Sequence, residues 1–597
     1  MTEIDRQRRM YAAGGGFLLD DAPPSSVSTP EDFTEEQRMF ADATEEFVDR
    51  EVLPHDESIE KLNYELTVKL LRKAGELGLL GADVPEAFGG LGLDKISSTI
   101  INERLARASS FALSVGAHVG IGTLPIVFFG TREQKERYLP QLATGEKIAA
   151  YCLTEPGSGS DALGAKTTAR LSDDGKHYLL NGSKIYITNG GFADVFIVYA
   201  KIDGTDFSAF IVERGMPGFS TGLEEKKMGI KGSSTVPLYF EDVPVPVENL
   251  LGERGKGHVI AFNILNIGRF KLAAGALGGC KEAIALAVSY ANERRQFGRS
   301  IAEFPLVRAK LADMNIRTYA LESMVYRTAG LVDEALEGID YGAPDAGLKA
   351  AKAIAEYAIE CSVNKVFASE ALDFVVDEGV QIHGGYGYVQ EYKIERMYRD
   401  SRINRIFEGT NEINRLLIPG TLLKKAAKGE LPLLKAAQQF QSELLSAAAP
   451  ASFEGTLAQE THLVGTMKKL FLFVGGAAAQ KYGRQFEQEQ EALADLADVI
   501  IWTYAAESAL LRTKKRIAAD GEAKASLALA MTCAFVQEAF EEIERIARRR
   551  LAAMEEGDAL RTMLSALKKL TRHQPIDVTS LKRAVAARVV EYERYAY

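Results

Sequence analysis

A strand-rich segment enclosed by two helical regions is the feature that most limits how this chain can fold. Apolar residues recur with helical spacing over residues 34–150, and from residue 151 the pattern changes to short alternating runs separated by turn residues. Helical spacing returns at residue 261 and continues beyond it. This order predicts a multidomain, mainly α protein in which a small antiparallel β-domain separates two helical parts.

Two dipeptides inside the strand-rich segment are typical of hairpin turns. Asn181-Gly182 lies within "KHYLLNGSKIYITNG", and Asp203-Gly204 lies within "VFIVYAKIDGTDFSAFIVE". Tight hairpin turns favour positive φ at their central residues, which Asn, Asp and Gly tolerate best. We therefore predict one β-hairpin at each dipeptide, with the flanking runs as its strands.

The chain is too long for a single hydrophobic core. At 597 residues it is expected to form three or four domains. Thr34 and the two glutamates after it are typical of a helix start, and "KKAAKGELPLL" interrupts the helical pattern at residues 424–434, beyond which it resumes. The predicted division is an irregular lead-in, an N-terminal helical domain, a central β-domain, a C-terminal helical bundle and an additional helical domain, at residues 1–33, 34–150, 151–260, 261–425 and 426–597.

One stretch of the predicted bundle shows which side of a helix is buried. The apolar residues there are spaced by 4, 3, 7 and 4 positions, and they are Val307, Leu311, Met314, Leu321 and Val325. This spacing places them on one face of a helix, so we expect that face to pack in the core.

Charge and cysteine pattern exclude several classes of protein. A formal net charge of −11 argues against nucleic-acid binding, which depends on many contacts from Lys and Arg to phosphate, and against permanent binding to an anionic membrane. The four cysteines are scattered singly without a C-x-x-C pair, so neither a metal site nor a disulfide framework is predicted. We expect a cytoplasmic protein without a signal peptide or a membrane-spanning helix.

Two stretches match known sequence motifs but lack the flanking strands and helices that those motifs require. "GSGSDA" at residues 157–162 matches a dinucleotide-binding pattern, yet the "AKTTARL" after it is typical of a strand where that fold needs a helix. "GFSTG" at residues 218–222 matches a hydrolase nucleophile pattern but has no buried strand before it and no apolar helix after it. His383 has neither a nucleophile nor a second ligand nearby in the sequence, so we interpret it as structural.

Three glycine-rich stretches indicate a ligand site: "YCLTEPGSGSDA", "ITNGG" and "QIHGGYGY". Glycine lets the backbone approach a bulky ligand and offers N–H donors without a Cβ in the way. Neighbouring Thr and Ser add hydroxyl donors, so such a surface suits a planar polar ring and a pyrophosphate. A single stretch would be read as a loop turn, but three of them together with "ERRQFG" favour a cofactor site.

These stretches, in this order, resemble the acyl-CoA dehydrogenase family. The resemblance is carried by "YCLTEPGSGSDA", "GSKIYITNGG", "ERRQFG", "QIHGGYGY" and "RIFEGTNEI", at residues 151–162, 182–191, 293–298, 381–388 and 405–413. It covers roughly residues 34–420. The helical extension after residue 425 resembles the long- and very-long-chain subgroup, which has an extra C-terminal helical domain.

The resemblance implies a fold and a reaction. The expected fold has a helical N-domain, a β-domain and a four-helix C-domain, with FAD in a cleft between the β-domain and the C-domain. The expected reaction is α,β-dehydrogenation of an acyl-CoA to the trans-2-enoyl-CoA: a glutamate takes the α-proton as the β-hydride passes to the flavin. Electrons would then leave to an electron-transfer flavoprotein, and a homodimer is the smallest expected assembly.

Residue roles follow by similarity to the family. The expected catalytic base is Glu408, because the other base position used in the family corresponds to Gly268 here, which has no side chain to accept a proton. The expected FAD contacts are Tyr151, Leu153, Thr154, Ser160, Tyr186 and Thr188, then Arg294, Gln296 and Phe297 toward a neighbouring subunit, and Gln381, Gly384, Gly385, Thr410 and Glu412. The expected substrate contacts are Ser160, Asn266, Arg269, Gly409, Gly120 and Gly122.

Glu408 also fits the chemistry. A thioester α-proton is too weakly acidic for an ordinary surface carboxylate to remove easily. Burial beside Phe407 and the flavin is expected to raise the pKa of Glu408, because desolvation penalises the charged form, and a base with a pKa near neutral pH is more effective. In the family, the backbone N–H of this glutamate also stabilises the thioester oxygen as enolate character develops. The alternative roles for Glu408 are a helix cap or an ion pair with Arg405.

Chain length and the role of the last domain are further expectations. Gly120 and Gly122, in "HVGIGTLPIVFFG", match the floor of the acyl pocket, and their small size predicts room for a long acyl chain. The alternatives to a dehydrogenase are an acyl-CoA oxidase that uses O2 and a non-catalytic assembly factor. We interpret "MKKLFLFVGGAAAQKYG", at residues 467–483, as a buried bundle helix, with dimerisation or weak peripheral membrane contact as the alternative.

Overall fold

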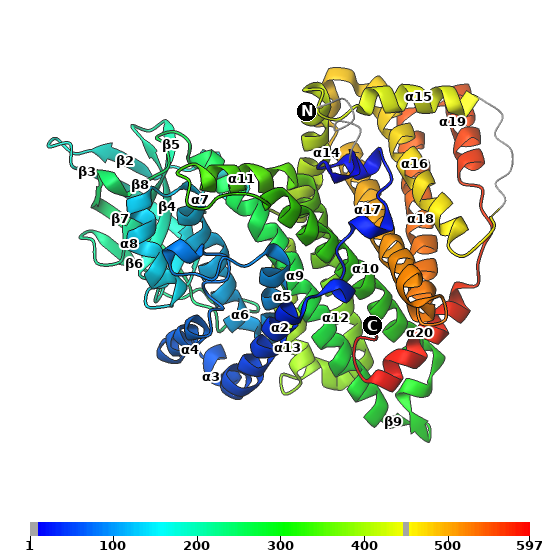
Figure 1. The fold of residues 1–597 in the computed structure, drawn as a ribbon, viewed down its shortest axis with the longest axis horizontal. Helices are drawn as coiled ribbons and strands as arrows, with labels where there is room; N and C mark the ends of the chain where they lie inside the picture. Colours follow the sequence, from blue (N-terminus) through cyan, green and yellow to red (C-terminus); the bar gives the residue numbers. More distant parts are fainter. Residues whose placement is uncertain (1–9, 446–452) are drawn as a thin grey trace.

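The computed structural model describes residues 10–445 and 453–597, so the predicted lead-in lies partly outside the described residues. Figure 1 shows an elongated molecule with the β-domain at one end and the additional helical domain at the other. The long helices of the bundle lie between these two ends. This order of layers agrees with the fold expected from the sequence.

The N-terminal helices pack beside the β-domain. They are α2 (Glu35–Phe47), α3 (Asp56–Glu60), α4 (Tyr64–Glu76), α5 (Lys95–Leu105), α6 (Ser109–Gly116), α7 (Leu124–Phe129) and α8 (Arg132–Ala143), with a π-helical turn, η9 (Ala117–Thr123), between α6 and α7. The predicted start of α2 is confirmed. The Thr34 side chain accepts a hydrogen bond from the Gln37 backbone N–H at 3.1 Å, and the Gln37 side chain accepts one from the Thr34 N–H at 3.0 Å.

The central domain is a single mixed sheet. Its strands are β1 (Ala149–Cys152), β2 (Thr168–Leu171), β3 (His177–Thr188), β4 (Val195–Ile202), β5 (Asp206–Glu213), β6 (Phe219–Thr221), β7 (Thr235–Pro246) and β8 (Leu250–Leu251). The order is β6-β7-β3-β2-β4-β5-β8, with β1 beside β4. β1 and β2 both run parallel to β4, one along each half of it, so the prediction of an antiparallel domain is wrong for these two pairs. The alternating pattern shows where strands lie, but it does not show the direction of the neighbouring strand.

One of the two predicted hairpins is confirmed and the other is wrong. Asp203 and Gly204, with φ of 52° and 79°, turn the chain from β4 into the antiparallel β5. Asn181 and Gly182 instead lie within β3, which stays paired with β7 on both sides of a register shift at this point. The Asn181 Nδ2 donates to Oδ1 of Asp242 at 2.8 Å, so the dipeptide forms a bulge braced by the neighbouring strand.

The bundle follows the sheet. It consists of α9 (Gly257–Glu293), a two-stranded arm of β9 (Arg295–Gln296) and β10 (Arg299–Ser300), α10 (Pro305–Leu336), α11 (Ala346–Glu356), α12 (Ala358–His383), α13 (Lys393–Ser401) and α14 (Asn411–Ala427). α9 begins just before residue 261, where helical structure was expected. The predicted face of α10 is confirmed: Val307 is partly buried, and the other four apolar residues of that face are fully buried.

The additional domain is a second set of helices packed against α10 and α14. It consists of α15 (Leu433–Leu445), α16 (Ala458–Tyr482), α17 (Gln490–Asp520), α18 (Ser526–Met554), α19 (Gly557–Leu570) and α20 (Val578–Tyr592). In α16, Met467, Leu470, Phe471 and Val474 are buried between α17 and α18. The interpretation of residues 467–483 as a bundle helix is therefore confirmed.

Two helical stretches of the described chain, Lys95–Phe129 and Gly257–Glu293, are long and apolar enough by composition to cross a membrane. Most of each stretch is buried inside the protein, at 78% and 61% of the most apolar window. Their apolar composition is therefore accounted for by core packing.

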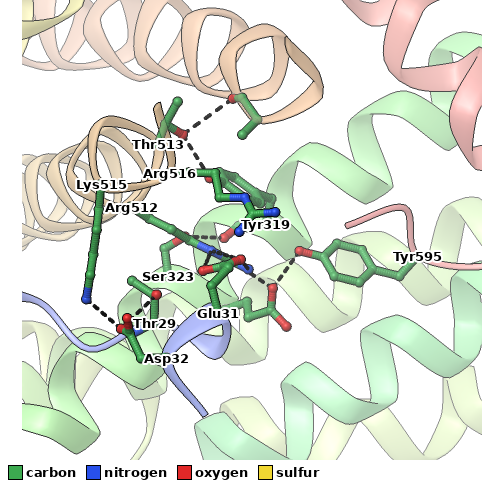
Figure 2. Close-up of polar contacts among 12 residues, drawn as sticks. Thr29, Glu31, Asp32, Tyr319, Ser323, Arg512, Thr513, Lys515, Arg516 and Tyr595 are labelled. Atoms are coloured by element: carbon green, nitrogen blue, oxygen red, sulfur yellow. Dashed lines mark hydrogen bonds and ion pairs between the residues drawn. The ribbon is translucent and has the colours of Figure 1, made fainter. Parts of the chain in front are cut away.

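The described part of the lead-in is irregular, as predicted, and it packs against α17. It consists of short 3-10 turns, and Phe17 packs edge-on against Tyr504 of α17 with ring centroids 4.7 Å apart. Farther along, Glu31 accepts a hydrogen bond from Nη2 of Arg512 at 2.6 Å. Figure 2 shows Arg512 reaching Glu31 while Tyr595 approaches the same cluster from the end of the chain. Arg512 thus joins both terminal segments to α10 and α17.

Candidate active site

Glu408 lies in a short loop between the 3-10 turn Arg402–Arg405 and α14. Glu408 and Gly409 both have left-handed backbones, with φ of 57° and 80°. Glycine adopts this conformation freely, but at a glutamate it costs about 1–3 kcal/mol. The surrounding residues must therefore hold this loop in place.

Side chains from three helices hold the loop by donating to its carbonyl oxygens. Arg269 of α9 donates from Nε to the Glu408 carbonyl at 3.1 Å. Lys365 of α12 donates from Nζ to the Gly409 carbonyl at 2.7 Å, and Asn414 of α14 donates from Nδ2 to the same oxygen at 2.8 Å. Together these donors fix the conformation of the loop that carries Glu408.

The Glu408 carboxylate is shielded from water. Its Oε2 atom is closed off from solvent and has no hydrogen-bond partner among the residues that the structure describes. Desolvation raises the pKa of Glu408 to about 7, while the charges of Arg269 and Lys365 act to lower it. The predicted rise in the pKa of Glu408 is therefore confirmed, and this carboxylate can accept a proton near neutral pH.

The alternative structural roles for Glu408 are excluded. Arg405 pairs with Asp373, with 3.1 Å between Nη2 and Oδ1, and not with Glu408. Thr410 caps α14, because its side chain accepts a hydrogen bond from the Ile413 backbone N–H at 3.2 Å. Glu408 is therefore neither the helix cap nor the partner of Arg405.

Gly268 of α9 provides the space that the carboxylate occupies. A Cβ at this position would lie 2.3 Å from Oε2 of Glu408 and 2.8 Å from its Cδ. No side chain fits there unless Glu408 moves. The absence of a side chain at residue 268 therefore makes room for the Glu408 carboxylate.

Three expected substrate residues lie next to Glu408. Asn266 and Arg269 are both buried, and Nη1 of Arg269 donates to Oδ1 of Asn266 at 3.0 Å. A Cβ at Gly409 would lie 3.6 Å from Nη2 of Arg269. The structure thus brings Asn266, Arg269 and Gly409 together around the proposed base.

Gly120 and Gly122 are packed differently from the expectation. A Cβ at Gly120 would lie 3.3 Å from Cδ of Lys271, and a Cβ at Gly122 would lie 2.8 Å from the Cβ of Ala149. These glycines therefore make room for the aliphatic part of the Lys271 side chain and for strand β1. Neither faces open space, so their packing does not support the argument that their small size deepens an acyl pocket.

The two segments expected around the flavin ring lie side by side. The carbonyl of Thr154 accepts a hydrogen bond from the Ile185 N–H at 2.9 Å, which joins the loop after β1 to strand β3. A register shift between Lys184 and Ile187 marks a bulge, where Tyr186 has φ of 59° and is 61% exposed. Bulges often turn a side chain toward a site.

The other expected residues of this group vary in burial. Tyr151 and Thr188 are partly buried, Leu153 is buried and Ser160 is exposed. Burial raises the pKa of Tyr151, with further contributions from Tyr199 and from the charge of Glu408. Tyr151, at the start of this group, therefore lies near enough to Glu408 for its charge to act on it.

A buried ion pair that sequence reasoning missed braces this region. Nζ of Lys184 lies 2.7 Å from Oε1 of Glu155, and Glu155 also accepts hydrogen bonds from the backbone N–H groups of Lys166 and Thr167. These contacts fix the glycine-rich loop after β1. A lysine inside an otherwise strand-like run was the only signal for them in the sequence.

A second group of expected FAD residues lies far from Glu408. Arg294, Gln296 and Phe297 follow the end of α9, and Phe297 is 94% exposed. Residues 268 and 294 are 26 positions apart, which along a helix is about 39 Å. Figure 1 shows the β9 arm at the end of the bundle opposite the β-domain. This group therefore does not join the Glu408 site within one chain.

Gln381, Gly384 and Gly385 belong to this distant group. All three are exposed at the end of α12, near Tyr386, and the guanidinium of Arg294 lies 5.4 Å from the ring centre of Tyr386. His383 is structural, as expected, because it stacks on Tyr290 with 4.2 Å between ring centroids.

Thr410 and Glu412, also expected near FAD, serve the start of α14. Thr410 is the N-cap of α14. The Glu412 carboxylate accepts a hydrogen bond from the Glu412 backbone N–H, which lowers the pKa of Glu412. Lys365 and Asn414 were not identified from the sequence. For Lys365 a signal exists, because it lies in the apolar run "SVNKVFASEAL" of a buried helix, where a charge needs specific partners.

The residues present fit FAD. A Cβ at Gly157, Gly159, Gly384 or Gly385 would meet no other atom within 4 Å, so the backbone at these loops is open to a large ligand. Oε2 of Glu408 is buried and unpartnered, which suits a reacting group placed against it. The first pair of glycines lies in the loop after β1, and the second pair lies in the distant group.

Protein-family models match most of the chain. They are described as the acyl-CoA dehydrogenase N-terminal domain at residues 34–146, the middle domain at residues 150–243 and the C-terminal domain at residues 255–423. A further model, also described as an acyl-CoA dehydrogenase C-terminal domain, matches residues 466–569 in the additional helical domain.

Individual relatives agree with the family models. A probable acyl-CoA dehydrogenase of Bacillus subtilis is 61% identical over 582 residues, which is 98% of each chain. The human mitochondrial very long-chain specific acyl-CoA dehydrogenase is 45% identical over 353 residues, covering 58% of this chain and 51% of that one. A crystal structure of an acyl-CoA dehydrogenase complexed with FAD from Bacillus anthracis has 59% identity and a TM-score of 0.96, covering 98% of this chain and all of that one.

Proposed function

The chain belongs to the acyl-CoA dehydrogenase family of FAD-dependent oxidoreductases, and we propose that it oxidises long-chain acyl-CoA with Glu408 as the base. Acyl-CoA dehydrogenase activity with FAD as the cofactor follows from the family. The identity of the base, the acyl chain length and the electron acceptor are the content of the proposal.

The unpartnered carboxylate of Glu408 is the observation that carries the proposal. A buried Oε2 without a hydrogen-bond partner is unfavourable unless a ligand uses it. With a pKa of about 7, a large fraction of Glu408 is deprotonated at neutral pH. The carboxylate is still basic enough to take an α-proton from a thioester. Arg269, Lys365 and Asn414 fix the loop, so the base is positioned before the substrate arrives.

The same loop offers a donor for the substrate carbonyl. In the described chain, the backbone N–H of Glu408 donates to no other residue. A donor beside the base can stabilise the negative charge that develops on the thioester oxygen as the α-proton leaves. FAD, when bound, supplies the acceptor for the β-hydride. The protein orients the thioester, excludes water from Oε2 and holds the transferred proton there.

The electron acceptor, the oligomeric state and the location complete the proposal. We propose an electron-transfer flavoprotein as the acceptor. We propose at least a homodimer, because the group around Arg294 lies about 39 Å along α9 from the Glu408 site and would serve a neighbouring subunit. The four free cysteines support a reducing compartment, the cytoplasm.

The chain-length proposal rests on likeness. The human relative is specific for very long chains, but a short-chain specific acyl-CoA dehydrogenase of Clostridium acetobutylicum is also 39% identical over 396 residues. Its similarity covers 66% of this chain and 99% of that one. The additional helical domain, which the resemblance links to the long-chain subgroup, favours the long-chain substrate.

A chain-length series with several acceptors tests the proposal. Flavin reduction in the purified holoenzyme would be followed anaerobically with saturated acyl-CoA thioesters from butyryl to stearoyl. We expect the highest kcat/KM with the long chains, fast reoxidation by an electron-transfer flavoprotein and slow release of H2O2 in air. Fast H2O2 release would show an oxidase, and absence of flavin reduction at every chain length would favour a non-catalytic assembly factor.

A further inference from the structure

Lys365 is a buried lysine without a carboxylate partner. Its side chain is fully buried in α12, and within the described chain no carboxylate lies at ion-pair distance from its Nζ. Nζ donates to the Gly409 carbonyl and to Oδ1 of Asn411, each at 2.7 Å. Both acceptors belong to the segment that follows Glu408.

A buried ammonium group is costly, because it loses its hydration. Desolvation lowers the pKa of Lys365 to about 8, and among nearby charges Glu408 makes the largest contribution in the opposite direction. Hydrogen bonds to two neutral oxygens only partly replace the lost water. A purely structural link between α12 and α14 could be made by a neutral amide at lower cost.

The partner of Lys365 is itself held in a network. Nδ2 of Asn411 donates to Oγ of Ser369 and to Oε1 of Glu370, each at 3.0 Å. Glu370 in turn accepts two hydrogen bonds from Arg415, at 2.7 and 3.0 Å. The oxygen atoms that orient Lys365 are therefore fixed, and so is the direction in which its charge is presented.

We propose that Lys365 is a positioning residue for Glu408: it holds the left-handed Glu408–Gly409 backbone and places a positive charge near the carboxylate. The charge opposes the effect of burial, so a larger fraction of Glu408 is deprotonated at neutral pH than burial alone would allow. The hydrogen bond to Gly409 keeps the carboxylate pointed at the space beside Gly268. This inference rests on the proposed role of Glu408 as the base.

Other titratable groups face the same pair. On Glu408 they are Arg269 from α9 and Tyr151 from β1, and on Lys365 they are Arg269, Glu370 from α12 and Glu412 from α14. The positive charge of Arg269 lowers the pKa of both residues. It therefore favours the charged form of Glu408 and disfavours the charged form of Lys365. Removal of Lys365 therefore leaves one cation, Arg269, beside Glu408, and the effect on proton affinity is partial.

Three substitutions separate charge from hydrogen bonding, with kcat/KM for flavin reduction by palmitoyl-CoA measured from pH 5.5 to 9. Lys365→Met removes both properties, Lys365→Gln keeps a donor without the charge, and Lys365→Arg keeps the charge. We expect the acidic limb of the profile to move up by about one pH unit in the first two variants, with about a tenfold loss at pH 6, and to stay in place in Lys365→Arg. Lys349→Met, which removes an exposed lysine of α11, is the matched control and should match the wild type.

The readouts distinguish this inference from a merely structural role and from failure of the proposed function. A structural role predicts lower thermal stability, or lower kcat/KM at every pH, without movement of the acidic limb; that result in Lys365→Gln would overturn the inference. Lys365→Gln also replaces Lys365→Met if the apolar variant does not fold. Absence of flavin reduction in both the wild type and Lys349→Met would reject the proposed function itself.

Discussion

Glu408 and Gly268 come from elements far apart in the sequence, yet they occupy one small space. The carboxylate fills the position where a side chain at residue 268 would lie. Packing at this point is therefore complementary, and a single added methyl group tests it. The same contact explains why a glycine is placed in the middle of a long helix, where it costs about 1 kcal/mol relative to alanine.

Gly268→Ala should lower the rate of flavin reduction by about 100-fold, because the new Cβ would displace the Glu408 carboxylate by about an ångström. The control is Gly275→Ala on the same helix, where a Cβ would meet no atom within 4 Å. Stopped-flow reduction by palmitoyl-CoA would measure both variants. Equal rates for Gly268→Ala and wild type would show that the carboxylate does not need this space.

The pH dependence of kcat/KM should reflect Glu408. The base accepts a proton only when deprotonated, so activity should rise with pH and reach half its maximum near pH 7. Folding raises the pKa of Glu408 from 4.5 to about 7, so the folded protein holds this proton more tightly than the unfolded chain does. The contribution of Glu408 to the free energy of unfolding should therefore fall as pH rises from 4.5 to about 7. Half-maximal activity at or below pH 5 would contradict the burial argument.

Sequence could predict Glu408, because a carboxylate in a known motif between Phe407 and Gly409 is recognisable without a fold. A buried lysine at residue 365 left a signal in its apolar run, but its partners could not be predicted, because they lie 44 and 46 positions away and meet it only after α12 and α14 pack. The packing of Gly120 against Lys271 was missed for the same reason: a glycine in a sequence does not show which atoms approach it.

At the level of helices and strands, the most regular patterns were predicted well. The face of α10 and the start of α2 depend on local spacing and capping, which the sequence contains. The Asn181-Gly182 dipeptide has the same local signal as Asp203-Gly204, but β7 pairs along β3 on both sides of it and overrides the turn. Strand direction and strand pairing depend on such distant partners, so they could not be predicted locally.

The elements at both ends of the chain meet at Arg512 (Figure 2). Its side chain is 2% exposed and is paired with Glu31 and Glu322, and the burial of these charges makes the cluster sensitive to removal of one partner. We expect Arg512→Ala to lower the free energy of unfolding by about 3 kcal/mol, the lower end of the cost of breaking a buried ion pair, since Glu322 keeps Lys281 as a partner.

A neighbouring arginine provides the control for that experiment. Arg516 of α17 pairs with Asp520 one turn later and is 35% exposed, so Arg516→Ala should cost less than about 1 kcal/mol. Chemical denaturation of both variants would measure the difference. Equal losses of stability would show that the cluster does not hold the terminal segments as proposed.

Across the whole molecule, the additional domain shares one hydrophobic core with the bundle. Trp502 of α17, the single tryptophan of the chain, packs against Phe367 of α12 and Phe535 of α18, with ring centroids 5.8 Å apart in each case. The additional domain therefore covers the helix that carries Lys365. Its packing on α12 therefore helps to hold the helix on which Lys365 lies.

The bundle and the additional domain should unfold together. Trp502 fluorescence reports on their contact, and far-UV circular dichroism reports on all helices, so both signals should change at the same denaturant concentration. Release of FAD should coincide with them. An earlier transition in Trp502 fluorescence, with helical content and bound FAD retained, would show that the additional domain is an independent unit.

Anaerobic titration of the Glu408→Gln holoenzyme with palmitoyl-CoA tests the account most directly. Glutamine preserves the shape of the side chain and removes its ability to take a proton. The wild type should lose its flavin absorbance within seconds. The variant should bind palmitoyl-CoA with similar affinity but reduce its flavin at least about 1,000-fold more slowly, as expected when the base is lost. Flavin reduction by Glu408→Gln at the wild-type rate would contradict the assignment of Glu408 as the base.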